Sequence, residues 1–147
     1  MIKLLIILLL GIFYVGFLQP QPAQTTSAPH GVAVKGDADQ ILADAFERHQ
    51  NHLQLQGQGK VIKILKDDRE GLEHQRFILR LANGRSLLVA HNIDLTPRIE
   101  NLQVGDTVEF YGEYEWNPQG GVLHWTHRDP HHHHIDGWLK HDGNTYQ

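Results

Sequence analysis

The chain has 147 residues, with thirteen Lys or Arg, seventeen Asp or Glu and a formal net charge of −4, and this size fits one domain with appendages. The acidic balance disfavours nucleic-acid partners, because sequence-independent binding of a polyanion depends on neutralising its phosphates with basic groups. Cysteine is absent, which excludes disulfides, thiolate metal sites, a cysteine nucleophile and a lipid on an N-terminal cysteine. Histidine is unusually frequent, at twelve residues.

Residues 1–18 form an apolar leader. After Lys3, the segment LLIILLLGIFYVGFL contains no polar group other than the Tyr14 hydroxyl, which is typical of a signal peptide. It is shorter than the roughly 20 residues of a bilayer span, so we expect a cleaved signal peptide or a short signal anchor, with a buried core helix as the weaker alternative. Lys3 is the only basic residue before Lys35, so the positive-inside preference places the domain outside the cytoplasm. The expected location is periplasmic or extracytoplasmic, secreted or tethered to the inner membrane.

Residues 19–36 are rich in Pro, Gln, Thr, Ser and Ala and lack amphipathic periodicity, which predicts a flexible linker. A single domain is expected over residues 37–147. It begins with a helix over about 37–50, which Asp37 can cap. The helix has one apolar stripe, made of Ile41, Leu42, Ala45, Phe46 and His49.

Five β-strands are expected over about residues 57–129, after a glutamine-rich link. The candidate strands share alternating or β-branched apolar patterns, and they cover residues 60–65, 74–81, 85–91, 104–116 and 122–127. Asn83-Gly84 is the strongest hairpin signal in the chain. Residues 92–103 contain Pro97 and predict an irregular connection. Residues 130–147 are expected to form an irregular C-terminal extension.

The order of these elements is that of an OB-type barrel: a meander of three strands, an irregular crossover and a hairpin of two. Closing a small sheet into a barrel removes its edges and encloses a core. The expected fold class is therefore mainly β, a five-stranded OB-like barrel with one preceding amphipathic α-helix and an N-terminal apolar signal or anchor segment. The run from Val104 to Val108 (VGDTV), followed by Gly112, resembles the fourth strand of many OB domains, where glycine permits a bend.

Two resemblances extend over the domain. The exported start, the G-x-V first strand, the acidic turn and the G-D-x-V strand resemble small periplasmic OB proteins of Gram-negative bacteria, which lack the aromatic and histidine-rich finish of this chain. More closely, the segments HQRFIL, VAHNIDL, GDTVEFYGEYEWN, GGVLHWTH and GWLKHDGNTYQ resemble an uncharacterised bacterial family of small exported domains over about residues 57–147. This resemblance implies an OB-like fold and an extracytoplasmic compartment, and it implies no activity.

The histidine-rich stretch over residues 124–138 is one candidate site. Imidazole and carboxylate groups bind zinc and other divalent metals, and His124, His127 and Asp129 lie within six residues. Strand alternation would place His124 and His127 on opposite faces unless a bulge intervenes. The favoured metal set therefore combines the strand end with neighbouring strands, and it consists of His74, His91, His127 and Asp129.

Residues 131–134 are four consecutive histidines. A polyhistidine loop binds divalent metals weakly through its composition alone and need have no role in the cell. The functional interpretation is metal scavenging or buffering outside the cytoplasm. Because histidine titrates near pH 6.5, acid surroundings could also charge this loop.

Basic and aromatic side chains form another candidate site. An OB barrel binds ligands across its second and third strands and the adjoining loops. There, Arg76, Arg80 and Arg85 could contact phosphate or carboxylate groups, and Trp125 could stack on a base or a sugar. Solvated strand faces explain the arginines equally well, and most aromatic side chains of this half are expected in the core.

Glu113 and Glu115 stand two residues apart on the polar face of the expected fourth strand, together with Glu109. Paired carboxylates can serve as acid and base. An acidic solvated face is the favoured interpretation, because nothing in the sequence locates a substrate between them. The chain lacks P-loop, G-x-S-x-G, H-E-x-x-H and G-x-G-x-x-G motifs, so the common hydrolase and nucleotide signatures are missing.

Three functions are compatible with these patterns. The first is an exported, non-enzymatic OB-type module of the bacterial envelope that binds an unidentified ligand and contacts the membrane if the leader is retained. The second is a metal-dependent hydrolase, with phosphodiesters as one substrate class, or a periplasmic metal-binding protein, and zinc is the divalent metal expected. The third is a structural envelope protein whose barrel docks on another protein. No catalytic residue is assigned.

Overall fold

The computed structural model describes residues 38–147, so the expected leader, the linker and the Asp37 cap lie outside the described residues. One helix precedes seven strands, with these bounds: α1 (Ala38–Glu47), β1 (Leu53–Ile64), β2 (His74–Arg80), β3 (Ser86–Asn92), β4 (Thr107–Glu115), β5 (Val122–His124), β6 (Trp138–His141) and β7 (Asn144–Tyr146). Within residues 38–147, no helix is long and apolar enough to cross a membrane.

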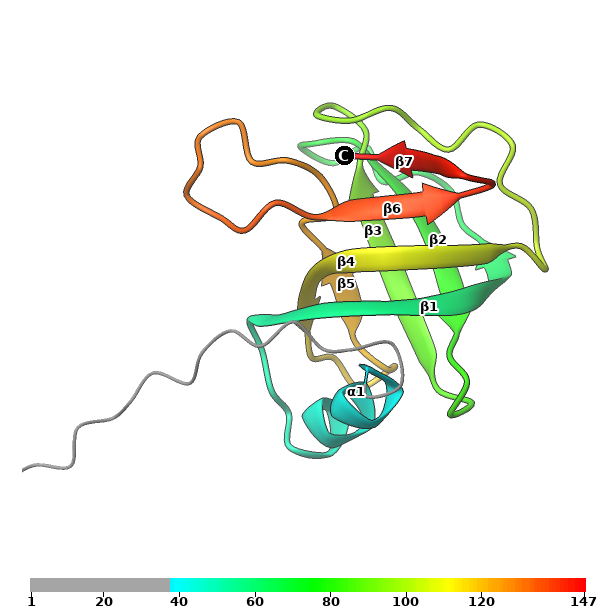
Figure 1. Cartoon of the computed structure of the whole chain (residues 1–147), viewed down its shortest axis with the longest axis vertical. Coiled ribbons are helices and arrows are strands. Elements are labelled where there is room, and N and C mark those ends of the chain that lie inside the picture. Colours follow the sequence, from blue (N-terminus) through cyan, green and yellow to red (C-terminus); the bar gives the residue numbers. More distant parts are fainter. Residues whose placement is uncertain (1–37) are drawn as a thin grey trace, which may run out of the picture.

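The first five strands form a closed barrel (Figure 1). The sheet order is β1-β2-β3-β5-β4-β6-β7, and a further pairing of β1 with β4 closes the ring. The β3–β5 contact is parallel, whereas the other pairings are antiparallel. The prediction of a mainly β, five-stranded OB-like barrel with one preceding helix is therefore confirmed.

Asn83-Gly84 forms the predicted turn between β2 and β3. Gly84 has a φ of 81°, a conformation that glycine adopts without steric cost. The Asn83 side chain accepts a hydrogen bond from the Arg85 backbone N–H at 2.9 Å and donates one to the Asp39 carbonyl at 2.7 Å. The turn therefore also ties α1 to the barrel.

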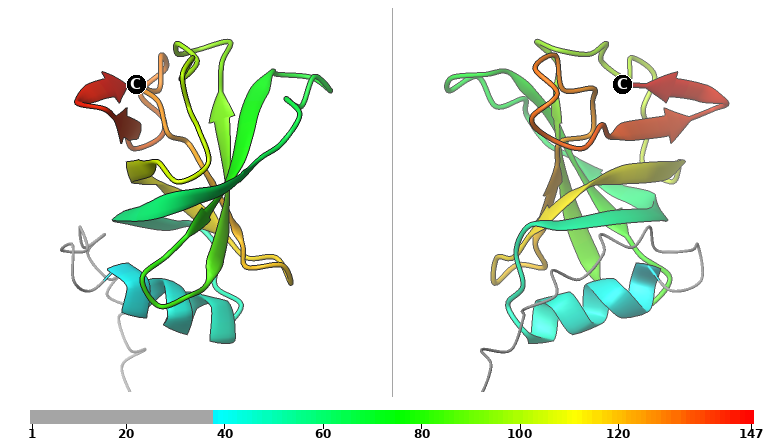
Figure 2. Two further views of the ribbon diagram at one scale, coloured as in Figure 1. Left: turned by 90° about the vertical axis from the view of Figure 1, so that its right-hand side faces the viewer. Right: turned by 60° about the vertical axis from the view of Figure 1, so that its left-hand side comes forward.

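The barrel interior is filled by alternate residues of the strands. Phe77, Phe110 and Tyr114 are among the largest side chains that are fully buried there, and burial of each phenylalanine contributes roughly 1.5–3 kcal/mol. Helix α1 lies across one end of the barrel (Figure 2). It buries Leu42 and Ala45 of the predicted stripe there, whereas His49 lies beyond the end of the helix and is exposed.

Strand β1 begins at Leu53, so the expected glutamine-rich link is a strand and the barrel starts before residue 57. Eight residue pairs join β1 to β4, from Leu53 with Tyr114 to Lys60 with Thr107. Glycine is required in this segment because a Cβ atom on Gly57 would lie 2.7 Å from the Phe110 ring. The two glycines near 57–59 are thus packing positions within a strand.

Further boundaries differ from the predictions. Helix α1 ends at Glu47 rather than near residue 50, and β4 begins at Thr107 rather than at Val104. Strand β5 ends at His124, three residues early, because Trp125 has a φ of 51° and leaves the extended conformation. The C-terminal segment expected to be irregular contains β6 and β7, which form a hairpin. In this hairpin, β6 pairs with residues 109–111 of β4. Short strands of three or four residues give little sequence pattern, but β4 supplies the hydrogen-bonding partner that makes them strands.

Candidate metal centre

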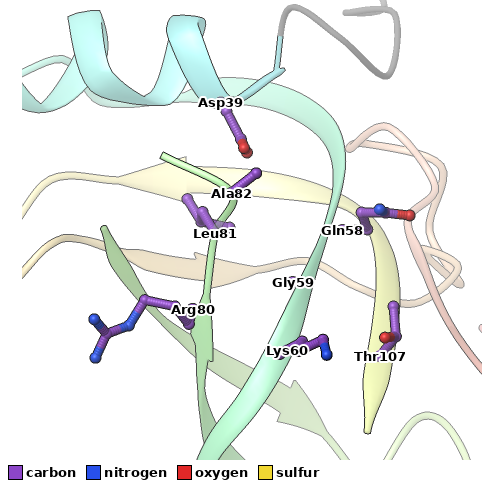
Figure 3. A pocket seen from close by; sticks show the side chains of 8 residues that line it. All are labelled: Asp39, Gln58, Gly59, Lys60, Arg80, Leu81, Ala82 and Thr107. Atoms are coloured by element: carbon purple, nitrogen blue, oxygen red, sulfur yellow. The ribbon is translucent and has the colours of Figure 1, made fainter. Parts of the chain in front are cut away.

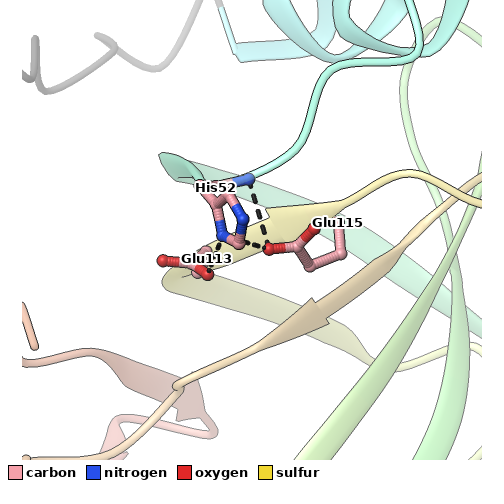
Figure 4. Close-up of side chains that lie close together, drawn as sticks. All are labelled: His52, Glu113 and Glu115. Carbon is pink, nitrogen blue, oxygen red and sulfur yellow. Dashed lines mark hydrogen bonds and ion pairs between the residues drawn. The ribbon is translucent and has the colours of Figure 1, made fainter.

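Glu113 and Glu115 project from the outer face of β4, because Tyr114 between them points into the barrel and is fully buried. His52 immediately precedes β1, and the pairing of Leu53 with Tyr114 brings its side chain to these two carboxylates. Among residues 38–147, these three are the one group of His, Asp, Glu or Cys side chains whose ligand atoms all lie within 4.8 Å of one another. Figure 4 shows the His52 ring directed at both carboxylates.

The distances within this group suit a small cation. His52 Nδ1 lies 2.7 Å from Glu115 Oε1 and 3.2 Å from Glu113 Oε1. Ligand atoms around a tetrahedral zinc ion, with bonds of about 2.1 Å, are about 3.4 Å apart. The three ligand atoms would therefore move by less than about 1 Å to hold zinc between them. We call His52, Glu113 and Glu115 the metal triad.

Two more histidines flank the metal triad. His124 is the cross-strand partner of Glu113, and its Nε2 lies 3.5 Å from Glu113 Oε1 and 4.0 Å from Glu115 Oε1. His134 Nε2 lies 2.6 Å from Glu113 Oε2, so the two oxygens of this carboxylate face different histidines. A hydrogen bond to the second oxygen is how proteins orient a metal-ligating carboxylate.

His134 reaches Glu113 from the loop that joins β5 to β6, which we call the histidine-rich loop (residues 125–137). Asp129 organises this loop from within. Its carboxylate accepts hydrogen bonds from the backbone N–H groups of three histidines, at 2.6 to 2.9 Å, namely His131, His133 and His134. These bonds, and that from the His131 N–H most strongly, lower the pKa of Asp129 to about 2. Asp129 is therefore ionised at neutral pH and holds the loop in shape.

The neck of the histidine-rich loop is packed against the barrel. The Gly137 N–H donates to the His127 carbonyl at 2.8 Å, and a Cβ atom on Gly137 would lie 1.9 Å from the Trp125 carbonyl oxygen. The Trp125 ring stacks on the His134 ring, with centroids 4.2 Å apart and planes 5° from parallel. These contacts fix the position of His134 beside β4.

The charges of the site favour a bound cation. Burial alone would raise the pKa of Glu113, but hydrogen bonds from His134 and then His52 hold it below its usual value. Burial, and next the neighbouring Glu113, raise the pKa of Glu115, so the charge on Glu115 is disfavoured unless a cation lies beside it. The hydrogen bond to Glu113 and the charge of Glu115 raise the pKa of His52. A divalent cation between the carboxylates would remove their repulsion.

A cavity of about 330 Å³ adjoins the metal triad and contains His52 and Glu113 in its wall. The opposite wall comes from the histidine-rich loop, through His133, His134 and Ile135. Gln54 also lines this cavity and is 7% exposed. Neither its amide nitrogen nor its amide oxygen has a hydrogen-bond partner among the described residues, which is rare for a buried polar group.

The metal set predicted from the sequence is distributed over separate environments. No three of its members form a group within the 4.8 Å limit in the part of the chain that the structure describes. His91 is fully buried between Thr126 and the Pro97 carbonyl, and the His74 ring faces the Leu72 carbonyl. His127 faces the Arg128 carbonyl at 2.7 Å. Metal binding by His74, His91, His127 and Asp129 stays a prediction that this geometry does not favour.

The predicted ligand-binding arginines do not converge on one position. Arg76 donates to the Lys66 carbonyl, and Arg85 pairs with Glu47. Arg80 lines a cleft of about 310 Å³ together with Lys60, but their side chains extend to opposite sides (Figure 3). Trp125 is the fourth residue predicted to bind a ligand. Its ring stacks on the His134 ring, beside the metal triad.

Sequence reasoning placed Glu113 and Glu115 on one outward face and favoured a solvated surface for them. It missed His52, which lies in the segment expected to link the helix to the barrel. The available signals were the alternation within the expected strand 104–116 and the expected neighbouring strand 122–127, which contains His124. The register of β1 against β4 was needed to bring His52 to the same place.

Comparison with known proteins agrees with the resemblance stated above. No curated protein sequence matches the chain. A family model described as "Protein of unknown function (DUF3465)" matches residues 27–147, which is most of the chain and includes every described element. The expectation of an uncharacterised family is confirmed, and the chain belongs to the DUF3465 family of proteins of unknown function.

Proposed function

We propose that this protein is an exported, non-enzymatic binding module of the bacterial envelope whose ligand is a divalent transition-metal ion, with zinc as the first candidate. The observation that carries the proposal is the metal triad: one imidazole nitrogen and two carboxylate oxygens that converge on the outer face of β4. The proposed binding site is therefore the metal triad, which differs from the sites expected from the sequence.

The ligand types favour zinc and its neighbours over calcium or magnesium. Calcium takes six to eight oxygen ligands and magnesium prefers an octahedron of oxygens, whereas a His and carboxylate set is typical of zinc. Copper and nickel also accept imidazole, and copper binds most tightly in the divalent series. Metal availability therefore decides between these ions, and zinc is the ion used in the experiments below.

The position of the triad on the barrel favours specific binding over loose capture. Glu113 pairs with β1 and β5, and Glu115 pairs with β5, so neighbouring strands hold the backbone positions of both carboxylates. Sites built on such elements are more precise than sites on loops. His52 sits at the entry to β1, where its backbone N–H donates to Glu115 Oε1 at 3.2 Å.

The test is zinc binding by the untagged full-length protein, measured by competition with a chromophoric chelator. One zinc ion per chain is expected. Replacing a second-shell group usually costs 10- to 100-fold in metal affinity, so Glu113→Gln and Glu115→Gln should each cost about a hundredfold or more. Glu109→Gln is the matched control, because Glu109 lies on the same face of β4 outside the triad and its loss should leave the affinity unchanged.

The histidine-rich loop requires a second control, because its consecutive histidines bind metal by composition alone. A variant with His131, His132 and His133 replaced by Gln removes these exposed side chains and keeps His134, which contacts Glu113. The tight site should survive in this variant. Loss of the tight site here, together with unchanged affinity in Glu113→Gln, would place the metal on the loop and refute the proposal.

Export is a separate part of the proposal, and its support is the apolar segment over residues 1–18. Cell fractionation should place the protein outside the cytoplasm, and N-terminal sequencing of the mature chain should distinguish a cleaved signal from a retained anchor. A protein recovered entirely from the cytoplasm with its first residues intact would refute export and leave the metal proposal standing.

A further inference from the structure

The cavity beside the metal triad has room for more than a metal ion. A triad of three protein ligands leaves a tetrahedral ion one open position. The wall of the cavity includes two triad members, His52 and Glu113. An ion bound to the triad would therefore be reachable from the cavity, and its open position would accept an oxygen or nitrogen atom of a second ligand.

Gln54 indicates what that second ligand offers. Its cross-strand partner on β4 is Glu113, so Gln54 lies next to the metal triad. The histidine-rich loop forms the other wall of the cavity that Gln54 lines. A buried amide without hydrogen-bond partners lowers the free energy of unfolding, and an apolar residue at this position would not have this cost. The amide presents N–H donors and a carbonyl acceptor, and both lack hydrogen-bond partners in the part of the chain that the structure describes.

We propose that the metal site takes its ion together with a small 2-hydroxycarboxylate, which the metal and Gln54 bind jointly. This inference rests on the proposed metal-binding function and names the second ligand of that site. A carboxylate oxygen of the ligand enters the open coordination position, and its other oxygen accepts a hydrogen bond from the Gln54 amide nitrogen. The hydroxyl group donates to the Gln54 carbonyl oxygen.

The choice of a 2-hydroxycarboxylate follows from the pairing of donor and acceptor. A simple carboxylate such as acetate would satisfy the Gln54 nitrogen and leave the carbonyl oxygen unpartnered, because a carboxylate only accepts hydrogen bonds. A site built to bind a hydroxyl group discriminates strongly against the analogue that lacks it, because its own polar group is then left unpaired. The ligand class is thus defined by two adjacent groups of opposite hydrogen-bonding character.

The experiment uses the full-length protein loaded with cobalt(II), whose visible absorption reports changes in coordination, and titrates it with glycolate. Glycolate is expected to shift the cobalt bands in a saturable way, and acetate is expected to bind at least about tenfold more weakly. Gln54→Leu should weaken glycolate binding by about tenfold or more, leave cobalt binding unchanged and raise the melting temperature, since it removes an unpartnered amide.

Gln56→Leu is the matched control, because Gln56 lies on the same strand and face but is outside the cavity wall. It should bind glycolate as the wild type does. Cobalt bands that do not respond to glycolate would overturn the inference, as would equal affinity for acetate or full glycolate binding by Gln54→Leu. The first result is expected if His124, whose Nε2 has no hydrogen-bond partner within residues 38–147, occupies the fourth position. Failure of cobalt and zinc to bind at all would instead refute the proposed function itself.

Discussion

His91 should make the protein less stable in mild acid. Its side chain is fully buried, with Nδ1 hydrogen-bonded to Thr126 Oγ1 at 2.8 Å and Nε2 at 3.3 Å from the Pro97 carbonyl oxygen. Burial lowers the pKa of His91 from 6.5 to about 4. In the unfolded chain the ring titrates near its ordinary pKa of about 6.5, so acid protonates the unfolded state first.

The sign and size of the effect follow from proton linkage. Between about pH 6.5 and pH 4 the unfolded state binds more protons at this residue than the folded state does, so the free energy of unfolding falls as the pH falls. At 1.36 kcal/mol per pKa unit, the interval between 6.5 and about 4 amounts to about 3 kcal/mol. The loss is complete below about pH 3 and absent above about pH 7.5.

The assay is urea unfolding of the wild type and His91→Gln at a series of pH values across this interval. Glutamine can still hydrogen-bond to Thr126 but does not titrate, so the difference in unfolding free energy between the two proteins should shrink by about 3 kcal/mol from neutral pH to about pH 4. His132→Gln, at an exposed position of the histidine-rich loop, serves as the control. If the difference in unfolding free energy between wild type and His91→Gln stays constant with pH, the lowered pKa of His91 is wrong.

Three further predictions concern the loop and the triad. Gly137→Ala should lower stability by at least about 1–3 kcal/mol in urea unfolding, because its Cβ would overlap the Trp125 carbonyl oxygen; Gly143→Asn, at an open turn, should not, and equal effects would contradict this account. Asp129→Asn should accelerate hydrogen exchange of the loop amides that it binds; in the wild type this restraint should persist above about pH 4 and weaken as the pH falls toward 2, because the pKa of Asp129 is lowered to about 2, and unchanged exchange in the variant would argue against it. His52→Gly should abolish tight zinc binding without lowering the melting temperature, since His52 has a φ of 57° that glycine adopts freely; retained zinc affinity would count against the triad.

The barrel was predictable where the chain carries local signals. Asn83-Gly84 defined the β2–β3 hairpin, and the alternation of 107–115 identified β4 and its buried face. The start of β1 was not predictable, because Gln54 and its neighbours lack β-branched side chains and become a strand through pairing with β4. The same physical reason explains the C-terminal hairpin, whose short strands depend on the edge that β4 offers them.

The site was predictable only in part, because it depends on long-range register. Alternation identified the outward face of Glu113 and Glu115, but His52 reaches them across more than sixty residues of chain. The many histidines led to the prediction of a metal site that includes His127 and Asp129. In the structure, the Asp129 carboxylate accepts hydrogen bonds from backbone N–H groups. In the sequence, an aspartate beside a run of histidines looks like a metal ligand. Only the three-dimensional path of the backbone shows that Asp129 binds backbone N–H groups of the loop.

The most direct test of the metal triad is a crystal structure of the zinc-loaded full-length protein, with the ion located by anomalous scattering at the zinc edge. One strong peak is expected at about 2.0–2.2 Å from His52 Nδ1 and from one oxygen each of Glu113 and Glu115. Peaks confined to the side chains of residues 131–134, with the triad still paired as in Figure 4, would contradict it.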